Sequence, residues 1–358
     1  MDEPSATTRV TLRDIARRLN VTHTTISRAL RDDPQVSTAL RQKIQQTAQA
    51  MGYRPDPMLA ALAHYRRAGV KSQICAELGW INPWPEAKEL RSFREFDLYW
   101  KGAFNEAERW GFRLEEFHLN AEMTPSRLHQ ILRARNIQGL LLPPKARDLM
   151  PNWAGFPWEE FCVVRFGHSI KYPAAHLVAS DQMSDGLIAF EKMRAHGYHR
   201  VGLITGASSS KSIVRFAAGY LFGGLGLPKA DRLPPLMLSQ ANASQDQQKL
   251  VTWFKRTQPD AILTDVASVG DMLKRAGFRV PRDVALAAMS VLDGNADAGI
   301  DQNSGEIGRA AVQLLISLIN HNERGIPKVC REVLIEGSWV DGKSLPPKII
   351  KDAPVSIN

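Results

Sequence analysis

The chain has 358 residues, of which 44% are hydrophobic, and its 46 Lys and Arg against 37 Asp and Glu give a formal net charge of +9. This length is too great for one average domain, so we expect one small and one large folding unit. The sequence shows no basic-then-apolar leader and no run of about 18 apolar residues, which argues against secretion, a membrane-spanning helix and a membrane partner. We therefore expect a cytoplasmic protein.

The three cysteines, Cys75, Cys162 and Cys330, are far apart and lack any Cys-x-x-Cys or Cys/His spacing. Spacings of that kind hold metal ions, so the sequence predicts no metal site and no bound cofactor. The cysteines are expected to be buried or free thiols.

Residues 1–70 concentrate the positive charge, with eleven Lys and Arg against six Asp and Glu. Such a surplus favours a polyanionic partner. It is also found on ordinary solvated surfaces, so charge alone leaves both interpretations open.

Residues 12–19 have the apolar spacing of a short amphipathic helix, with Leu12, Ile15, Ala16 and Leu19 on one face. Thr11 is placed to cap its first turn, and the helix is predicted to end at Asn20. Asn tolerates the left-handed conformation, which a chain reversal within three residues requires.

A second short helix is predicted to follow the N-cap Thr22, with Ile26, Ala29 and Leu30 facing inward. Its outward face carries His23, Thr24, Ser27, Arg28 and Arg31. Short donors and acceptors followed by guanidinium groups can bind base edges and phosphates in a DNA groove.

A third helix is predicted to start after the N-cap Ser37 and to end at Gly52, with Leu40, Ile44, Ala48 and Met51 on one side. Two short helices joined by a tight turn and braced by a third form a helix-turn-helix unit. The alternative is a three-helix bundle that binds protein. We disfavour it because such a surface needs aromatic or aliphatic anchors, which the second helix lacks.

The N-terminal segment closely resembles the LacI/GalR (lactose-repressor) family of transcriptional regulators. The resemblance rests on the runs Val10–Ala16, Val21–Leu30, Val36–Ser37 and Met51–Pro55, without gaps over about fifty positions. It implies that His23, Thr24 and Arg28 contact bases and that Thr11, Thr22, Ser27 and Arg31 lie near phosphates or flanking bases, with Tyr53 also in the DNA interface. Asn20 stands where the family usually has Gly.

Residues 58–70 are predicted to form a hinge helix and linker after the helix-turn-helix domain of residues 1–57. A helix of about eight residues without a long partner is marginal in water, so this one should order only when something packs on it. The resemblance implies that it pairs with its twin in a homodimer on pseudo-palindromic double-stranded operator DNA and inserts Leu62 into the minor groove. An ordinary linker helix is the alternative, because Leu59 replaces a usual Ala and Arg66 and Arg67 lengthen the helix.

Residues 71–358 alternate between apolar strand-like runs and helical stretches, which indicates an α/β domain with parallel sheets and a ligand crevice at the carboxyl ends of the strands. The runs His196–Ile204, Pro259–Leu263, Ala276–Val284 and Ile307–Val312 resemble the effector-binding and dimerisation domain of the same family. That domain has two lobes, is similar to periplasmic sugar-binding proteins, and implies a small-molecule effector such as a sugar.

Several effector-binding positions of the family pattern differ in this chain. The usual Arg falls at Phe216, an Asn-Asp pair becomes Thr264–Asp265, and an Asp-Asp pair becomes Ser290–Val291. A typical sugar is therefore in doubt. Our candidate effector-binding residues are Tyr99, Asp181, Arg215, Asp265 and Asp301, each with an alternative role as a cap or surface charge. Trp80, Trp84 and Trp100 could stack on a ligand, although core packing is the commoner role.

An α/β enzyme, or a ligand-binding module, with a basic N-terminal appendage is the alternative function. The loop Gly206–Ser212 resembles a phosphate-binding loop but lacks the glycine before its lysine. No Gly-x-Ser-x-Gly or His-Glu-x-x-His motif is present, so the sequence favours regulation over catalysis.

Overall fold

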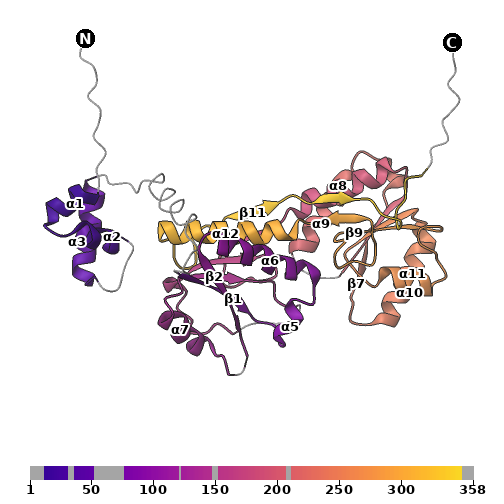
Figure 1. The fold of residues 1–358 in the computed structure, drawn as a ribbon. Helices are drawn as coiled ribbons and strands as arrows, with labels where there is room; N and C mark the ends of the chain where they lie inside the picture. The colour runs from indigo at the N-terminus through magenta and orange to yellow at the C-terminus, as the bar shows by residue number, and fades with distance from the viewer. Residues whose placement is uncertain are drawn as a thin grey trace, which may run out of the picture. The chain divides into compact units, whose positions relative to one another are not determined.

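The structure is a computed structural model that describes residues 12–30, 36–51, 76–120, 122–146, 152–206 and 211–348. The chain divides into two compact units, Met1–Ser72 and Gln73–Asn358. Figure 1 shows the helical first unit and the α/β second unit, and each is described by itself below.

The first unit contains α1 (Leu12–Leu19), α2 (His23–Ala29) and α3 (Thr38–Ala50). Ile15, Ile26 and Ile44, one from each helix, are fully buried against one another. Ala16, Ala29, Val36 and Ala48 complete this small core. The three predicted helices and their inward faces are thus confirmed.

The turn between α1 and α2 has the geometry that the sequence predicts. Asn20 has a φ of 52°, in the left-handed region, and the Val21 N–H then donates to the Ala16 carbonyl at 3.1 Å. Thr22 caps α2, because its hydroxyl accepts a hydrogen bond from the Thr25 N–H at 3.2 Å.

The second unit consists of two lobes, each built on a six-stranded sheet. The first lobe contains β1 (Ala76–Asn82), β2 (Phe112–His118), β3 (Gly139–Leu142), β4 (Cys162–Phe166), β5 (His176–Ser180) and β11 (Glu332–Ile335). These strands are parallel, in the order β11-β5-β4-β3-β1-β2. The helices of this lobe include α6 (Arg94–Arg109), α7 (Pro125–Ala134) and α12 (Ser304–His321), together with the short α5 (Ala87–Leu90) and the 3-10 helix η1 (Trp158–Glu160).

The second lobe repeats this arrangement. It contains β6 (Val201–Gly206), β7 (Leu236–Leu238), β8 (Ala261–Thr264), β9 (Ala285–Ala288), β10 (Gly299–Asp301) and β12 (Ser338–Val340), in the order β12-β10-β9-β8-β6-β7. All neighbours are parallel except β10 and β12. The helices of this lobe include α8 (Gln182–Ala195), α9 (Lys211–Gly223), α10 (Ala243–Thr257) and α11 (Val269–Arg275), with the 3-10 helix η2 (Lys229–Asp231).

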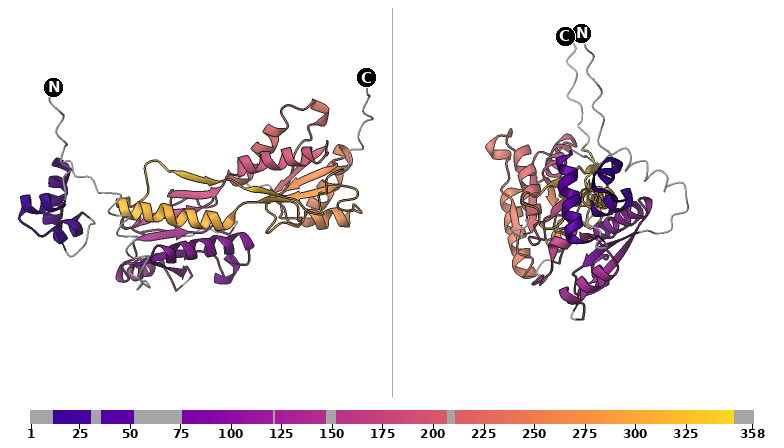
Figure 2. Two further views of the ribbon diagram at one scale, coloured as in Figure 1. Left: turned by 45° about the horizontal axis from the view of Figure 1, so that its top comes forward. Right: turned by 90° about the vertical axis from the view of Figure 1, so that its left-hand side faces the viewer.

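Three chain segments connect the lobes. The chain leaves the first lobe between β5 and α8, returns between β10 and α12, and leaves again between β11 and β12. Within the second unit α8 packs on α9 and α12 packs on α6; the left-hand view of Figure 2 shows α12 beside α6.

Glycines let the two helix pairs approach closely. A methyl group added to Gly102 of α6 would lie 2.0 Å from the Gly305 carbonyl oxygen of α12, and one added to Gly308 would lie 2.2 Å from the Tyr99 carbonyl oxygen. The pair α8 and α9 has the same feature, since a methyl at Gly219 would lie 2.0 Å from the Met183 carbonyl oxygen. Only glycine leaves room for backbones this close.

The central strands of each sheet are buried on both faces, which explains their nearly continuous apolar sequences. On β3, Leu141 packs on the side of α6 and α12, whereas Leu140 and Leu142 pack on the opposite side. Cys162 is buried and Cys330 partly buried, both as free thiols, as predicted, while Cys75 lies outside the described residues. No helix among the described segments is long and apolar enough to cross a membrane.

Candidate DNA interface and effector cavity

The outward face of α2 is the candidate DNA interface. His23 at its first turn and Arg28 near its end are exposed, whereas Ile26 and Ala29 on the opposite side are fully buried. Thr22 is exposed as well, and its hydroxyl lies 2.8 Å from that of Thr25. Thr24 and Ser27 belong to the same helix. The polar residues Thr22 and His23 therefore lie at the N-terminus of α2, the positive end of the helix dipole, which favours nearby phosphate groups.

Four of the predicted DNA-contacting residues, Thr11, Arg31, Tyr53 and Leu62, lie outside the described residues, as does the predicted hinge at residues 58–70. Their roles remain predictions from the sequence.

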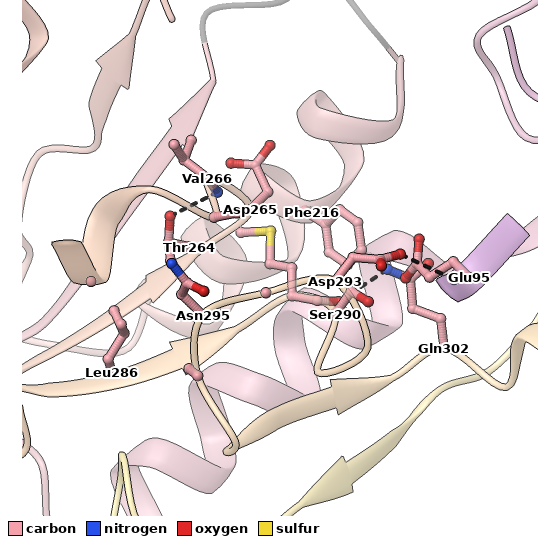
Figure 3. Close-up of a pocket in the computed structure, with 15 residues that line it drawn as sticks. Glu95, Phe216, Thr264, Asp265, Val266, Leu286, Ser290, Asp293, Asn295 and Gln302 are labelled. Atoms are coloured by element: carbon pink, nitrogen blue, oxygen red, sulfur yellow. Dashed lines mark hydrogen bonds between the residues drawn. The ribbon is translucent and has the colours of Figure 1, made fainter. Parts of the chain in front are cut away.

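A cavity of about 170 Å³ lies where the two lobes face each other (Figure 3). The loops that follow β8 and β9 form most of its wall, and α6 of the first lobe contributes Glu95. Its polar and aromatic lining residues include Glu95, Phe216, Thr264, Asp265, Ser290, Asp293, Asn295 and Gln302. The cavity lies at the carboxyl ends of parallel strands, where ligand sites of α/β folds are expected.

One side of the cavity is held by a contact between the lobes. The Asp293 carboxylate, after β9, accepts hydrogen bonds from the Arg94 N–H at 2.8 Å and the Glu95 N–H at 3.0 Å. These N–H groups belong to the first turn of α6, whose own N-cap residue, Phe93, provides no side-chain hydrogen bond. A residue of the second lobe thus caps a helix of the first.

The Glu95 carboxyl has an unfavourable environment for its charge. Burial raises its pKa to about 7, and the nearby Asp293 and Asp301 also raise it, although an interaction with the Ser290 hydroxyl opposes the shift. Its buried Oε1 and the Ser290 Oγ nevertheless lack a hydrogen bond of good geometry. The cavity therefore contains a carboxyl group that a bound ligand could satisfy.

Asp185 forms a second acidic site near the segments that join the lobes. It is fully buried, its Oδ1 accepts a hydrogen bond from the Gly337 N–H at 2.8 Å, and its Oδ2 has no partner. Burial raises its pKa to about 7, the Gly337 hydrogen bond opposes this, and Asp181, Glu336 and Glu95 add to the rise.

Four of the five positions that the sequence analysis singled out as different lie in the cavity wall, and Val291 is not among its described lining residues. Phe216, at the position of the usual Arg, lines the cavity together with Thr264, Asp265 and Ser290. Arg215 is not among the described lining residues, and its guanidinium forms an ion pair with Glu332 at 2.7 Å.

The structure brings some of the other candidates near the cavity. Asp301 lies close enough to Glu95 to raise its pKa, and its carboxylate accepts a hydrogen bond from the Asn303 N–H at 2.9 Å. Asp181 caps α8 by accepting from the Ser184 N–H and hydroxyl. Tyr99 is buried and stacks on Phe166 with ring centroids 5.3 Å apart, and burial raises the pKa of its hydroxyl.

The three tryptophans considered as stacking platforms are not among the described lining residues of the cavity. Trp80 is fully buried and meets Trp100 edge to face at 5.3 Å. The Trp84 indole N–H donates to the Pro144 carbonyl at 2.7 Å. These contacts place them in or beside the core of the first lobe.

Sequence reasoning missed Glu95, Asp293 and Gln302, which line the cavity. Glu95 lies one helical turn before Tyr99, so the spacing of four residues could have indicated a shared face. Asp293 and Gln302 follow strands of the second lobe at positions that no local pattern marks. Among the described residues, no group of three or more His, Cys, Asp or Glu side chains is arranged to hold a metal ion.

Comparisons with known proteins agree with this architecture. The sequence pattern of the family "Bacterial regulatory proteins, lacI family" matches residues 11–56, and that of the "Periplasmic binding protein-like domain" matches residues 190–345. The HTH-type transcriptional regulator GntR of Escherichia coli (strain K12) is 26% identical over 369 residues, which cover 96% of this chain and 95% of that protein.

Two similar solved structures cover 94% of this chain. The complex of the transcriptional regulator CelR with cellobiose has a TM-score of 0.57 at 18% identity, and the match covers 100% of that chain. The lac repressor dimer bound to operator and the anti-inducer ONPF has a TM-score of 0.52 at 16% identity and is covered at 99%. At these identities the structures show a shared fold.

The relatives named by these comparisons are transcription regulators. The first unit thus contains a helix-turn-helix segment that matches the lacI family of bacterial regulatory proteins, and the second contains a segment that matches the periplasmic-binding-protein-like domain.

Proposed function

We propose that the protein is a sequence-specific transcriptional regulator, acting as a homodimer on operator DNA, whose affinity for the operator is set by a small molecule bound between the lobes. The observation that carries this proposal is the exposed polar face of α2, with His23 and Arg28 opposite a fully buried apolar side. Base edges are recognised by such side chains in the major groove.

In this proposal residues 1–57 bind DNA, residues 58–70 form the hinge, and residues 71–358 bind effector and dimerise. His23, Thr24 and Arg28 contact bases, and Leu62 enters the minor groove. The remaining interface residues, near phosphates or at the edge of the site, are Thr11, Thr22, Ser27, Arg31 and Tyr53. The lac repressor structure, which is a dimer bound to operator, supports this assignment.

The second unit is the proposed sensor. Solved structures of similar fold contain cellobiose or D-xylulofuranose, which supports a small polar effector for this chain. The proposed effector-binding residues are Tyr99, Asp181, Arg215, Asp265 and Asp301, of which Asp265 lines the cavity. The effector shifts operator affinity only to the extent that it binds the two lobe arrangements differently.

Regulation without catalysis is part of the proposal, as is a cytoplasmic location, where operator DNA is found. A protein of this design changes DNA affinity by binding and needs no turnover of its ligand. Incubation of the purified protein with a bound effector should therefore leave that compound chemically unchanged.

The test is DNA affinity measured with a duplex selected by the full-length protein from a random library. Arg28→Ala should weaken binding to that duplex by about 1–3 kcal/mol and barely alter binding to random DNA. Arg256→Ala, which removes an exposed arginine from α10 in the second unit, serves as the matched control. Equal losses on both duplexes, or no selected duplex at all, would contradict the proposal.

A further inference from the structure

The described lining of the cavity between the lobes is acidic. Of the 15 lining residues, Glu95, Asp265 and Asp293 carry carboxylates, and none of the 15 is a Lys or Arg. Asp301 adds to the negative field, because it lies near enough to raise the pKa of Glu95. A ligand in this cavity therefore meets an excess of negative charge.

The three carboxylates differ in the partners that the protein gives them. Asp293 accepts two backbone N–H groups of α6, and Asp265 accepts the Gly206 N–H at 3.1 Å. Glu95 has a buried oxygen without a hydrogen-bond partner. Figure 3 shows Glu95 reaching from α6 towards the loop that carries Ser290 and Asp293. An unpaired buried carboxylate oxygen is unfavourable, so this position is where a donor on the ligand would be most stabilising.

Phe216 contributes an aromatic ring to the cavity wall. The guanidinium of Arg215, one residue earlier, forms an ion pair with Glu332 instead. An aromatic ring cannot balance a negatively charged ligand, but its face attracts ammonium groups. The ring of Phe216 thus favours a cationic ligand over an anionic one.

We propose that the effector is a small amine, protonated at neutral pH, whose ammonium group is bound by Glu95 while its body contacts Phe216 and the polar side chains of Thr264, Asn295 and Gln302. The proposal rests on the function proposed above and names the chemical class of its ligand. The volume of about 170 Å³ is below the range of about 300–1,000 Å³ for drug-sized ligands, so the amine is about the size of a monosaccharide or smaller.

The other ligand classes fit less well. An anion would add charge to the three carboxylates without any lining Lys or Arg among the described residues. A neutral polyol could donate a hydrogen bond to Glu95 but would leave the excess charge in place. An ammonium group supplies both the donor and the charge, and it would return the pKa of Glu95 towards its ordinary range.

The test compares matched compounds that differ only in charge. Thermal unfolding of the full-length protein is followed with glucosamine, glucose and glucuronate, and with putrescine, 1,4-butanediol and succinate. A compound that binds only the folded state raises the Tm by mass action. We expect at least one amine to raise the Tm more than its neutral and anionic counterparts. If no amine does so, the proposal is wrong.

A variant then assigns the interaction to Glu95. Glu95→Gln keeps the shape of the side chain but loses its charge, so the Kd of the stabilising amine should rise by about tenfold or more. Glu108→Gln, an exposed glutamate of the same helix, should leave that Kd unchanged. An unchanged Kd in Glu95→Gln would overturn the assignment.

DNA binding separates this proposal from the function on which it rests. Affinity for the selected duplex is measured in parallel with each compound. If glucose or glucuronate changes that affinity and the amines do not, the protein is an effector-controlled regulator and the amine class is wrong. Absence of a selected duplex, with an amine still raising the Tm, would instead retain the amine site and refute the regulatory function.

Discussion

Asp293 of the second lobe caps the backbone N–H of Glu95 in the first lobe, at 3.0 Å, and both residues line the same cavity. The capped turn is the start of α6, so a carboxylate lies at the positive end of the helix dipole. The short loop that follows β9 thus both contacts the first lobe and forms part of the cavity wall.

Asp293→Ala should destabilise the folded protein. It removes the acceptor of two N–H groups of α6, and loss of a helix cap costs about 0.5–2 kcal/mol. Urea unfolding monitored by tryptophan fluorescence gives the free energy of unfolding. Asp271→Ala, at an exposed position of α11, is the control, and equal stability of the two variants would rule out a capping role for Asp293.

The helix pairs should not tolerate side chains at their glycine contacts. Gly102→Ala and Gly219→Ala would each place a methyl group 2.0 Å from a backbone oxygen of the partner helix, so we expect a loss of about 1–3 kcal/mol in unfolding free energy. Gly226→Ala has no atom within 4 Å of the new methyl and should change it by less than about 0.5 kcal/mol. If all three variants had similar free energies of unfolding in urea, the close approach of the helix backbones would not contribute to stability.

Asn20 should be replaceable by glycine but not by a β-branched residue. Its φ of 52° costs valine about 1–2 kcal/mol, whereas glycine adopts it freely. Asn20→Gly should therefore keep the affinity for the selected duplex, and Asn20→Val should weaken it. Asn105→Val, at an exposed position of α6, controls for the substitution itself. Full affinity in Asn20→Val would mean that the turn geometry is unimportant for DNA binding.

Stability should fall as the pH rises through the range where Glu95 and Asp185 ionise. Burial raises both pKa values to about 7, with neighbouring carboxylates adding to the shift, from ordinary values of 4.5 and 3.8. Between about pH 4 and pH 7 the folded state thus binds protons that the unfolded state has released, and the stabilisation present below this range is lost across it. Urea unfolding at several pH values should show this slope.

The decrease in unfolding free energy with rising pH should be smaller in Glu95→Gln, because the glutamine side chain cannot ionise. It should be unchanged in Glu108→Gln. The charged and polar groups that act on Glu95 include Ser290, Asp293 and Asp301, and those that act on Asp185 include Asp181, Glu336 and Glu95 itself. An identical slope in Glu95→Gln and the unsubstituted protein would assign the pH dependence to other groups.

The helical unit could be predicted almost completely from the sequence. Its apolar spacing, the Thr22 cap and the left-handed Asn20 are local features, and the structure contains each of them. In the second unit the longer strands and helices also follow from local patterns. Examples are β6, with six consecutive buried residues, and α10, which begins at its Asn242 cap.

The sequence did not predict β5, β7, β10, β11 or β12. Four of them adjoin the segments that join the lobes, and three, β7, β10 and β12, have only three residues each. A strand of this length is stabilised by its neighbours in the sheet, so it leaves little local signal. The antiparallel pairing of β10 with β12 was also unforeseen, because the alternation of strands and helices predicts parallel sheets.

The cavity was only partly predictable for a similar reason. Asp265 directly follows a recognisable strand, whereas Glu95 and Asp293 meet only because the lobes fold against each other. Contacts between residues about two hundred positions apart have no local pattern.

The last strands of the two sheets also have a consequence for biosynthesis. β11 forms an edge of the first sheet and β12 an edge of the second, although both are made after every other described element. A polypeptide truncated before Glu332 would lack one edge strand in each lobe and leave the hydrogen-bonding groups of β5 and β10 exposed. Neither lobe can therefore be completed while the ribosome is still translating the residues before this segment.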